Sequence, residues 1–182
     1  GERRSWQHLE ELTPLIEHIF VASEDKRFFD HYGVDWLSLA RVARDLLIDQ
    51  RLRSGASTIS MQLAKIYWPE LKTPWHKGTQ MLLAMYLELR MSKGEILSEY
   101  LNSVPFGFQR VGVGIACEFF FAGHCSSLSP SQLASLAVIP RNPSHYTKDL
   151  DSLFEMKNRL LKTVGNTMDA SSLELALSER VR

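Results

Sequence analysis

A segment near the N-terminus brings together a carboxylate, an aromatic ring and an imidazole at a spacing suited to acid–base chemistry. Each residue of a helix turns the chain by about 100°, so a helix through this segment would place Glu24, Phe28 and His31 on one face. A carboxylate beside an aromatic ring loses hydration, which suits it to work as a general acid or base. The same residues also fit a solvated helix end of mixed charge, and this segment alone favours that simpler interpretation.

A second segment, residues 53–65, has the composition of an anion cradle. A glycine turn precedes two hydroxyl residues at a predicted helix start, and an amide and an ammonium group follow along one stripe of that helix. Free backbone N–H groups at a helix start attract anions, and cations at both ends of the segment add full charges. An ordinary Ser/Thr N-cap is compatible with the same pattern. The candidate anion ligands are Arg53, Gly55, Ser57, Thr58, Gln62 and Lys65.

Two further segments carry weaker signals. Lys77 and Gln80 share a face where a predicted helix begins, which is either an exposed first turn or the edge of a cleft. Residues 93–102 form an amphipathic helix, and we expect this segment to be structural because its most regular feature is one apolar face. That face consists of Ile96, Leu97, Tyr100 and Leu101.

The elements that must position these segments are helices. The apolar periodicity is helical nearly everywhere, no internal repeat is found, and the alternating run typical of a sheet is missing. The pattern at 77–91 is apolar on most faces and predicts a buried central helix, and most apolar side chains between 67 and 87 are assigned to the core. In the second helix, Leu37, Ala40, Leu46 and Leu47 are expected to face inward. The fold class is therefore all-α, with helices over about 14–29, 35–50, 57–67, 77–91, 95–102, 130–139 and 151–164, and an apolar helix carrying Phe119, Phe120 and Phe121 after a glycine-rich loop that includes Gly107, Gly112 and Gly114.

Composition excludes several classes of protein. The chain has 182 residues, 45% of them hydrophobic, with 21 basic and 21 acidic side chains. This balance excludes an intrinsically disordered chain and gives no bulk electrostatic attraction to nucleic acid. Cys117 and Cys125 are too few for a disulfide scaffold and fit no zinc pattern, so they are either free thiols or a single bridge. No stretch reaches the about 18 apolar residues of a spanning helix, so the chain is expected to be soluble or peripheral, or a fragment whose anchor is missing.

Taken together and in this order, the four segments resemble the peptidoglycan glycosyltransferase domain of family 51. This is the transglycosylase module of bifunctional penicillin-binding proteins and of monofunctional cell-wall polymerases, and the likeness covers roughly residues 14 to 148. The family's first motif, E-D-x-x-F-x-x-H-x-G, is matched by Glu24, Asp25, Phe28, His31 and Gly33. The second, close to G-G-S-T-I-T-Q-Q, is matched by Gly55, Ser57, Thr58, Ile59 and Gln62. The fourth, K-x-x-I-L-x-x-Y-L-N, is matched by Lys93, Ile96, Leu97, Tyr100, Leu101 and Asn102.

The third motif is where this sequence departs from the family. The family pattern is R-K-x-x-E, and its three fixed positions are occupied here by His76, Lys77 and Gln80. The family's second glutamate is therefore an amide in this chain. An amide can orient a substrate or a cation ligand, although less strongly than a carboxylate.

The resemblance implies a fold and a reaction. The fold would be a lysozyme-like α-lobe with a smaller membrane-facing jaw, with the glycosyltransferase domain at 1–150 and a C-terminal helix and tail at 151–182 packing on it. The enzyme would polymerise lipid II into glycan strands, inverting the anomeric carbon with polyprenyl pyrophosphate as leaving group. Glu24 would be the general base and Gln80 would stand in the second catalytic position. Substrate-binding residues would be Asp25, Phe28, His31, Arg53, Gly55, Ser57, Thr58, Gln62, Lys65 and Lys77.

The resemblance also implies surroundings for the reaction. No cofactor is required and no residue is assigned to a metal, although a divalent cation, magnesium or manganese, stays open because some family members use one at the pyrophosphate. The partners would be lipid II, the lipid-linked glycan chain, the membrane surface and cell-division or elongation proteins, with no nucleic acid. The location would be the periplasmic or extracytoplasmic face of the bacterial inner membrane.

Two other functions remain open. A lysozyme-like enzyme that cleaves peptidoglycan also uses a glutamate on an α-lobe, but a typical hydrolase pairs two carboxylates about 5–9.5 Å apart. No second acid is evident in this sequence, because position 80 is occupied by Gln80. A neutral glycan substrate would also give no reason for the basic residues of the anion cradle. A weakly active or inactive module that binds lipid II is the third interpretation, because the third motif is degraded.

Overall fold

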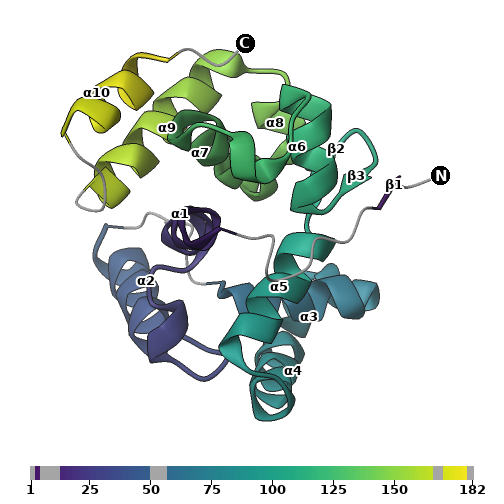
Figure 1. The fold of residues 1–182 in the computed structure, drawn as a ribbon. Helices are drawn as coiled ribbons and strands as arrows, with labels where there is room; N and C mark the ends of the chain where they lie inside the picture. The colour runs from purple at the N-terminus through teal and green to yellow at the C-terminus, as the bar shows by residue number, and fades with distance from the viewer. Residues whose placement is uncertain (1–2, 5–12, 50–56, 166–169, 180–182) are drawn as a thin grey trace. The chain divides into compact units, whose positions relative to one another are not determined.

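The computed structural model describes residues 3–4, 13–49, 57–165 and 170–179, and it is helical over most of them (Figure 1). This confirms the all-α prediction. The chain divides into two compact units. One unit comprises Gly1–Ser23 and Leu101–Arg182, and the other comprises Glu24–Tyr100.

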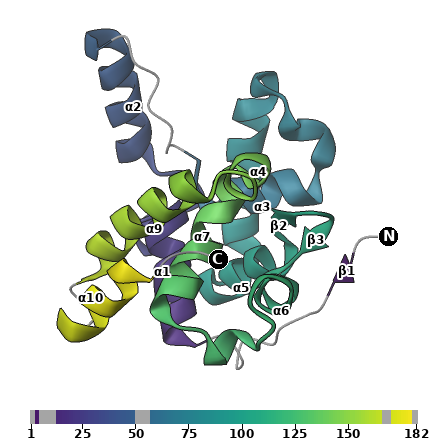
Figure 2. The same ribbon diagram turned by 90° about the horizontal axis from the view of Figure 1, so that it is seen from above.

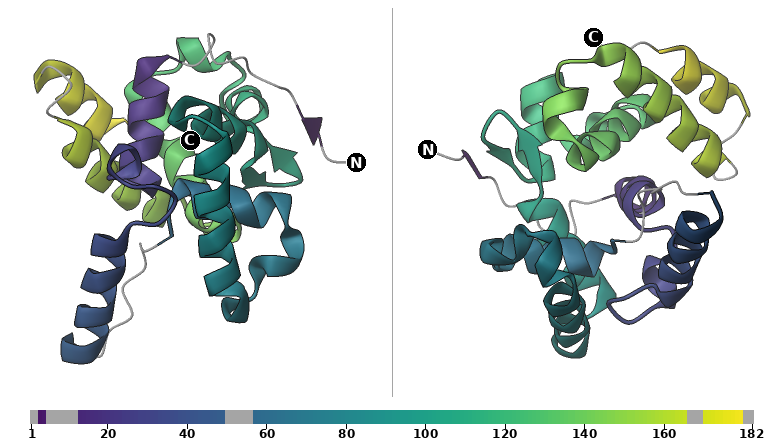
Figure 3. Two further views of the ribbon diagram at one scale, coloured as in Figure 1. Left: turned by 90° about the horizontal axis from the view of Figure 1, so that it is seen from below. Right: turned by 180° about the vertical axis from the view of Figure 1, so that it is seen from behind.

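The unit Glu24–Tyr100 contains the first three motif segments and most of the fourth. Its longer helices are α2 (Trp36–Asp49), α3 (Ile59–Tyr67), α4 (Lys77–Arg90) and most of α5 (Lys93–Ser103). Short 3-10 turns connect them, namely η2 (Phe28–Asp30), η3 (Pro69–Lys72) and η4 (Pro74–His76). Helices α3 and α4 lie side by side (Figure 3), and the apolar face predicted for α5 is buried.

The other unit is built on α1 (Pro14–Glu24), α7 (Pro130–Val138) and α9 (Leu150–Val164). Helices α7 and α9 pack along each other (Figure 2), and Ser23 Oγ donates to the carbonyl of Ala137 at 2.7 Å. The capping box at Ser129 and Gln132 forms as its sequence indicates. The remaining helices are α6 (Val113–Phe121), η5 (Cys125–Ser127), η6 (Ile139–Arg141), α8 (Pro143–Tyr146) and α10 (Ala170–Ser178).

A small sheet in this unit was not expected from the sequence. Strands β2 (Pro105–Gly107) and β3 (Arg110–Val111) form an antiparallel hairpin, and β1 (Arg3–Arg4) pairs with β3 in parallel. Strands of two or three residues are too short to produce a readable alternation of polar and apolar side chains. The prediction that no sheet is present was therefore wrong for these short segments, while the fold class is unaffected.

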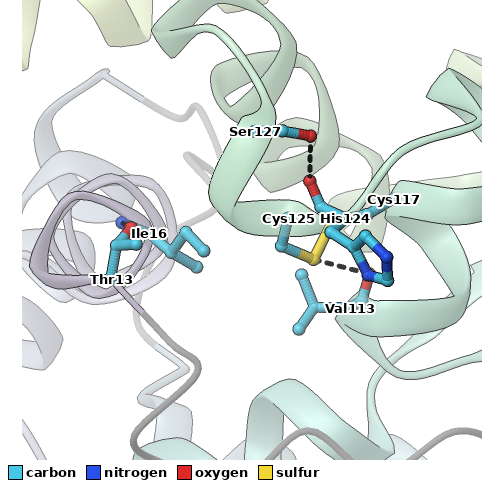
Figure 4. The surroundings of a disulfide bond; sticks show 7 residues. All are labelled: Thr13, Ile16, Val113, Cys117, His124, Cys125 and Ser127. Atoms are coloured by element: carbon cyan, nitrogen blue, oxygen red, sulfur yellow. Dashed lines mark hydrogen bonds between the residues drawn. A yellow bond between two sulfur atoms is a disulfide. The ribbon is translucent and has the colours of Figure 1, made fainter.

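The two cysteines form one disulfide, which decides between the two states left open by the sequence. Cys117 in α6 is bonded to Cys125 at the start of η5, and both are buried (Figure 4). The carbonyl oxygen of Val113 lies 3.5 Å from Cys125 Sγ, and Ser127 Oγ donates to the carbonyl of His124 at 2.8 Å. The bridge thus fixes the short turn that follows α6.

The first helix ends earlier than its pattern predicts. It stops at Glu24, and the chain turns before the short helix η2, so Glu24, Phe28 and His31 do not share one helical face. The physical reason is that Asp25 leaves the helix to accept the backbone N–H of Ile59 at 3.0 Å. Long-range partners of this kind are invisible to a local periodicity argument.

The burial predicted for two helices was wrong. In α2, Leu37 is 61% exposed and Leu47 is 83% exposed, although both were expected to face inward along with Ala40 and Leu46, which are exposed too. Helix α4 is not a buried central helix, because Leu89 is 84% exposed and the part of α4 that is buried consists of Gln80, Ala84 and Leu87. Apolar periodicity defines which residues share a face, but it does not say whether the fold covers that face.

Replacement of Gly33 by alanine is expected to lower the free energy of unfolding by about 2–4 kcal/mol. Gly33 has a φ of +83°, and an added Cβ would lie 2.6 Å from the backbone carbonyl carbon of Ala84. Backbone cannot move aside as a flexible side chain can. Urea unfolding followed by circular dichroism measures the effect. The matched control is Gly78→Ala in the first turn of α4, where nothing lies within 4 Å of the added atom, and equal midpoints for the two variants would refute the prediction.

Candidate active site

The carboxylate of Glu24 is held by a side chain from another motif segment. Glu24 is half-buried at the C-terminal end of α1, and its Oε2 accepts a hydrogen bond from Nε2 of Gln62 in α3 at 2.9 Å. Oε1 of Gln62 accepts in turn from the hydroxyl of Tyr100 in α5 at 3.2 Å. The structure thus joins the first, second and fourth motif segments in one hydrogen-bonded chain that ends on the candidate base.

Asp25 and His31 organise the start of α3. Asp25 Oδ2 accepts the backbone N–H of Ile59 at 3.0 Å and lies 3.0 Å from Nε2 of His31, and both side chains are buried. Thr58 caps the same helix, since its Oγ1 accepts from the N–H of Met61 at 3.1 Å and donates to the carbonyl of Gly33 at 2.6 Å. These bonds fix the distance between the first and second motif segments.

This arrangement changes how the anion cradle works. The N–H groups of Ile59 and Met61 at the start of α3 are already bonded to Asp25 and Thr58, and the N–H of Gln62 donates to the carbonyl of Thr58. The N–H groups of Ile59 and Met61 therefore serve side chains of the protein itself. The cap and the cradle are compatible in the sequence, but a local pattern cannot assign the N–H of Ile59 to the distant carboxylate of Asp25.

Two lysines supply positive charge close together. Nζ of Lys77 donates to Oγ of Ser57 at 2.7 Å. Partial burial, and then the positive charge of Lys65, lower the pKa of Lys77 below its ordinary value. The two ammonium groups repel each other in a partly buried setting. A highly charged anion bound between them would offset this repulsion.

Phe28 lies in the protein core rather than facing solvent. Its ring is fully buried, and Nζ of Lys93 lies 4.4 Å from the ring centroid. The same ammonium group donates to Glu88 Oε1 at 2.7 Å, and Ser60 Oγ also donates to Glu88 Oε1, at 2.5 Å. This buried network connects α3, α4 and α5 behind Phe28. Glu88 was not among the predicted site residues, and its only signal in the sequence is that it is a charged residue within a largely apolar helix.

The remaining predicted site residues fall into two groups. Gln80 is 3% exposed in the first turn of α4, so for this side chain the alternative of an exposed first turn was wrong. Arg53 and Gly55 lie outside the described residues. Within residues 13–49, 57–165 and 170–179, no three His, Cys, Asp or Glu side chains gather as a metal-binding cluster.

Comparison with known proteins shows which family this chain resembles. The model of a family described as transglycosylase matches residues 1–168. A biosynthetic peptidoglycan transglycosylase of Chromobacterium violaceum is 36% identical over 145 residues, which cover 79% of this chain and 64% of that protein. Penicillin-binding protein 4 of Bacillus subtilis is 31% identical over 172 residues, covering 92% of this chain and 28% of the relative. Penicillin-binding protein 1A of Escherichia coli is 35% identical over 147 residues, which cover 80% of this chain and 17% of that protein.

A solved structure shows the same fold. The crystal structure of penicillin-binding protein 1A from Haemophilus influenzae matches with a TM-score of 0.55 at 17% sequence identity, covering 100% of this chain and 18% of that one. This chain therefore spans from less than a fifth to under two thirds of the lengths of the relatives named here.

Proposed function

Because the chain belongs to the transglycosylase family, whose model matches residues 1–168, we propose that it is a peptidoglycan glycosyltransferase that polymerises lipid II into glycan strands. The observation that carries the proposal is the bond of 2.9 Å between Glu24 and Gln62. Gln62 stands on α3, the same helix that carries Lys65, so one rigid element connects a positioned carboxylate with a cation.

The proposed reaction is a single displacement at the anomeric carbon of the donor, a glycan chain linked through pyrophosphate to a polyprenyl lipid. The 4-hydroxyl oxygen of the acceptor sugar forms a bond to that carbon while the bond from the carbon to the diphosphate oxygen breaks. The hydroxyl proton passes to Glu24, and the electron pair leaves with the diphosphate. Attack from the face opposite the leaving group inverts the α configuration of the donor to β.

The leaving group needs positive charge rather than a second acid. A diphosphate is stable as an anion, and preorganised cations stabilise the charge that develops on it in the transition state. Lys65 and Lys77 are the proposed cations, with Ser57 holding Lys77. Arg53 and Gly55 are proposed to complete the cradle. This division of work makes Gln80 compatible with catalysis, because no step requires a second carboxylate.

We propose that the chain needs no resident cofactor. A magnesium or manganese ion, where one is used, would take ligands mainly from the diphosphate, since within the described part of the chain no three potential metal ligands gather. The carboxylate of Asp25, the neighbour of Glu24 in the sequence, is already bonded within the protein to the N–H of Ile59 and to His31. A cation bound to the diphosphate would supply additional charge stabilisation.

The proposed place of action is a membrane surface on the extracytoplasmic side. Among the described residues, no helix combines the length and the apolar character that crossing a bilayer requires. Helix α2 nevertheless exposes large apolar side chains suited to the interfacial region of a bilayer, including Trp36, Leu47 and Ile48. The disulfide between Cys117 and Cys125 suits an oxidising compartment. Cell-division or elongation proteins are proposed as partners.

A polymerisation assay tests the proposal. A membrane-anchored form of the protein is incubated with lipid II, and the products are resolved on a gel with and without a phosphoglycolipid inhibitor that mimics the donor. We expect a ladder of glycan polymer that the inhibitor abolishes. Absence of polymer would overturn the proposal, and release of soluble muropeptides from purified cell wall would favour the lysozyme-like cleaving enzyme instead.

Replacement of Gln80 by glutamate is expected to raise the polymerisation rate by up to about fivefold. A carboxylate makes charge-assisted hydrogen bonds about twice as strong as those of an amide, so it should hold a substrate group or cation ligand more firmly. Initial rates on lipid II measure the change, and Gln80→Leu, which keeps the volume but loses the polar group, should lower the rate. Binding of lipid II without turnover in both the native protein and Gln80→Glu would instead support an inactive binding module.

A further inference from the structure

The amide of Gln62 has two possible orientations, and its neighbours decide between them. One end of an amide donates hydrogen bonds and the other accepts them, and a half turn exchanges the two ends. In the structure, Nε2 faces Glu24 Oε2 at 2.9 Å and Oε1 faces the hydroxyl of Tyr100 at 3.2 Å. An ionised Glu24 accepts hydrogen bonds only, so the opposite orientation would place two acceptors against each other.

Tyr100 is held where it can support this orientation. Its side chain has an exposed fraction of 0%, and it stands on α5, where Ile96, Leu97 and Leu101 are also buried. The phenol therefore has a fixed position from which its hydroxyl donates to Oε1 of Gln62. The two hydrogen bonds of the chain are partly buried, and in such a chain each bond polarises the next one.

We propose that Tyr100 is a positioning residue that acts through Gln62 to keep Glu24 hydrogen-bonded and in place, both before and after it takes a proton, an inference that rests on the proposed function. The hydroxyl of tyrosine both donates and accepts. Once Glu24 has taken the proton from the hydroxyl of the acceptor sugar, the amide of Gln62 rotates by half a turn. Its Oε1 then accepts from the protonated carboxyl of Glu24, and its Nε2 donates to the hydroxyl oxygen of Tyr100. No bond within the relay is lost in either state.

Phenylalanine at position 100 removes the hydroxyl and keeps the ring, so it tests the relay without emptying the core. In Tyr100→Phe we expect kcat for lipid II polymerisation to fall about tenfold while KM changes by less than twofold. Tyr67→Phe is the matched control, since it removes a phenol bonded to Glu99 at 2.7 Å, outside the relay. It should leave both constants unchanged, and a thermal melt checks that each variant is folded.

A double-mutant cycle separates the relay from a merely structural role. In the Gln62→Met background, Tyr100→Phe should cause no further loss of kcat, because the connection to Glu24 is already broken. Full additivity of the two losses, or an unchanged kcat in Tyr100→Phe, would overturn the relay.

A spectroscopic measurement keeps this inference distinct from the proposed function. The side-chain amide resonance of Gln62, assigned by its disappearance in Gln62→Met, should shift in Glu24→Gln and in Tyr100→Phe but not in Tyr67→Phe. If these shifts occur and the native protein makes no polymer, the relay stands and the polymerase proposal fails. If the native protein makes polymer and the Gln62 resonance does not shift in Tyr100→Phe, the relay fails and the polymerase proposal stands.

Discussion

Glu24→Gln is expected to reduce polymerisation of lipid II by about 10³-fold or more, because glutamine cannot accept the proton that the attacking hydroxyl must lose. The substitution keeps the size of the side chain, and its amide oxygen still accepts from Nε2 of Gln62, so the hydrogen bond of 2.9 Å has a counterpart in the variant. The loss should therefore appear in kcat, with KM nearly unchanged. Initial rates with labelled lipid II measure both constants.

The control for this substitution removes a different carboxylate. Glu99 lies on α5 and accepts from the hydroxyl of Tyr67, and Glu99→Gln should polymerise at the native rate. A Glu24→Gln variant that melts at the native temperature and still makes polymer within threefold of the native rate would remove Glu24 from the mechanism. In that case, neither the polymerase mechanism nor the lysozyme-like mechanism would have an identified catalytic base.

Lys65→Met is expected to lower kcat by about 10²–10³-fold, the usual cost of losing one preorganised group that stabilises charge in a transition state. The side chain sits on α3, on the helix that also carries Gln62, and its positive charge is close enough to lower the pKa of Lys77. Removing it takes away one proposed partner of the diphosphate. It also frees Lys77 from a repelling neighbour, so the pKa of Lys77 should move back toward its ordinary value.

Two further variants test whether the loss of kcat in Lys65→Met is due to the loss of a positive charge at this site. Lys65→Arg keeps the charge and should retain more than a tenth of the native rate, although the planar guanidinium does not reproduce an ammonium ion. Lys148→Met removes an exposed lysine of the other unit and should have no effect. A rate that falls equally in Lys65→Met and Lys148→Met would indicate that general attraction to an anionic membrane, rather than a diphosphate site, accounts for the role of Lys65.

Local patterns were enough to predict several elements closely. The helices expected over 130–139 and 151–164 match α7 and α9 closely, because caps and periodicity act over one or two helical turns. The apolar face of α5 was also predicted correctly. The motif order and spacing predicted the family, which the match over residues 1–168 confirms.

The roles within the site needed long-range contacts. That Asp25 binds substrate stays a prediction, and the structure adds that its carboxylate holds the start of α3, 34 positions away in the sequence. Phe28 was assigned to the substrate too, and it lies fully buried beneath the ammonium group of Lys93. Residue type and spacing do not distinguish a carboxylate that faces a ligand from one that caps a helix, because both environments favour the same group.

By itself, the sequence determined the helical class, most helix boundaries and the set of chemical groups available for the proposed reaction, since these follow from interactions within a few residues. Only the tertiary structure decided that α1 stops at Glu24, that the faces of α2 and α4 stay uncovered, and that Gln62 and Tyr100 converge on the candidate base. The reason is physical. Helix formation is settled by neighbouring residues, whereas burial and side-chain partners depend on which distant segments the folded chain brings into contact.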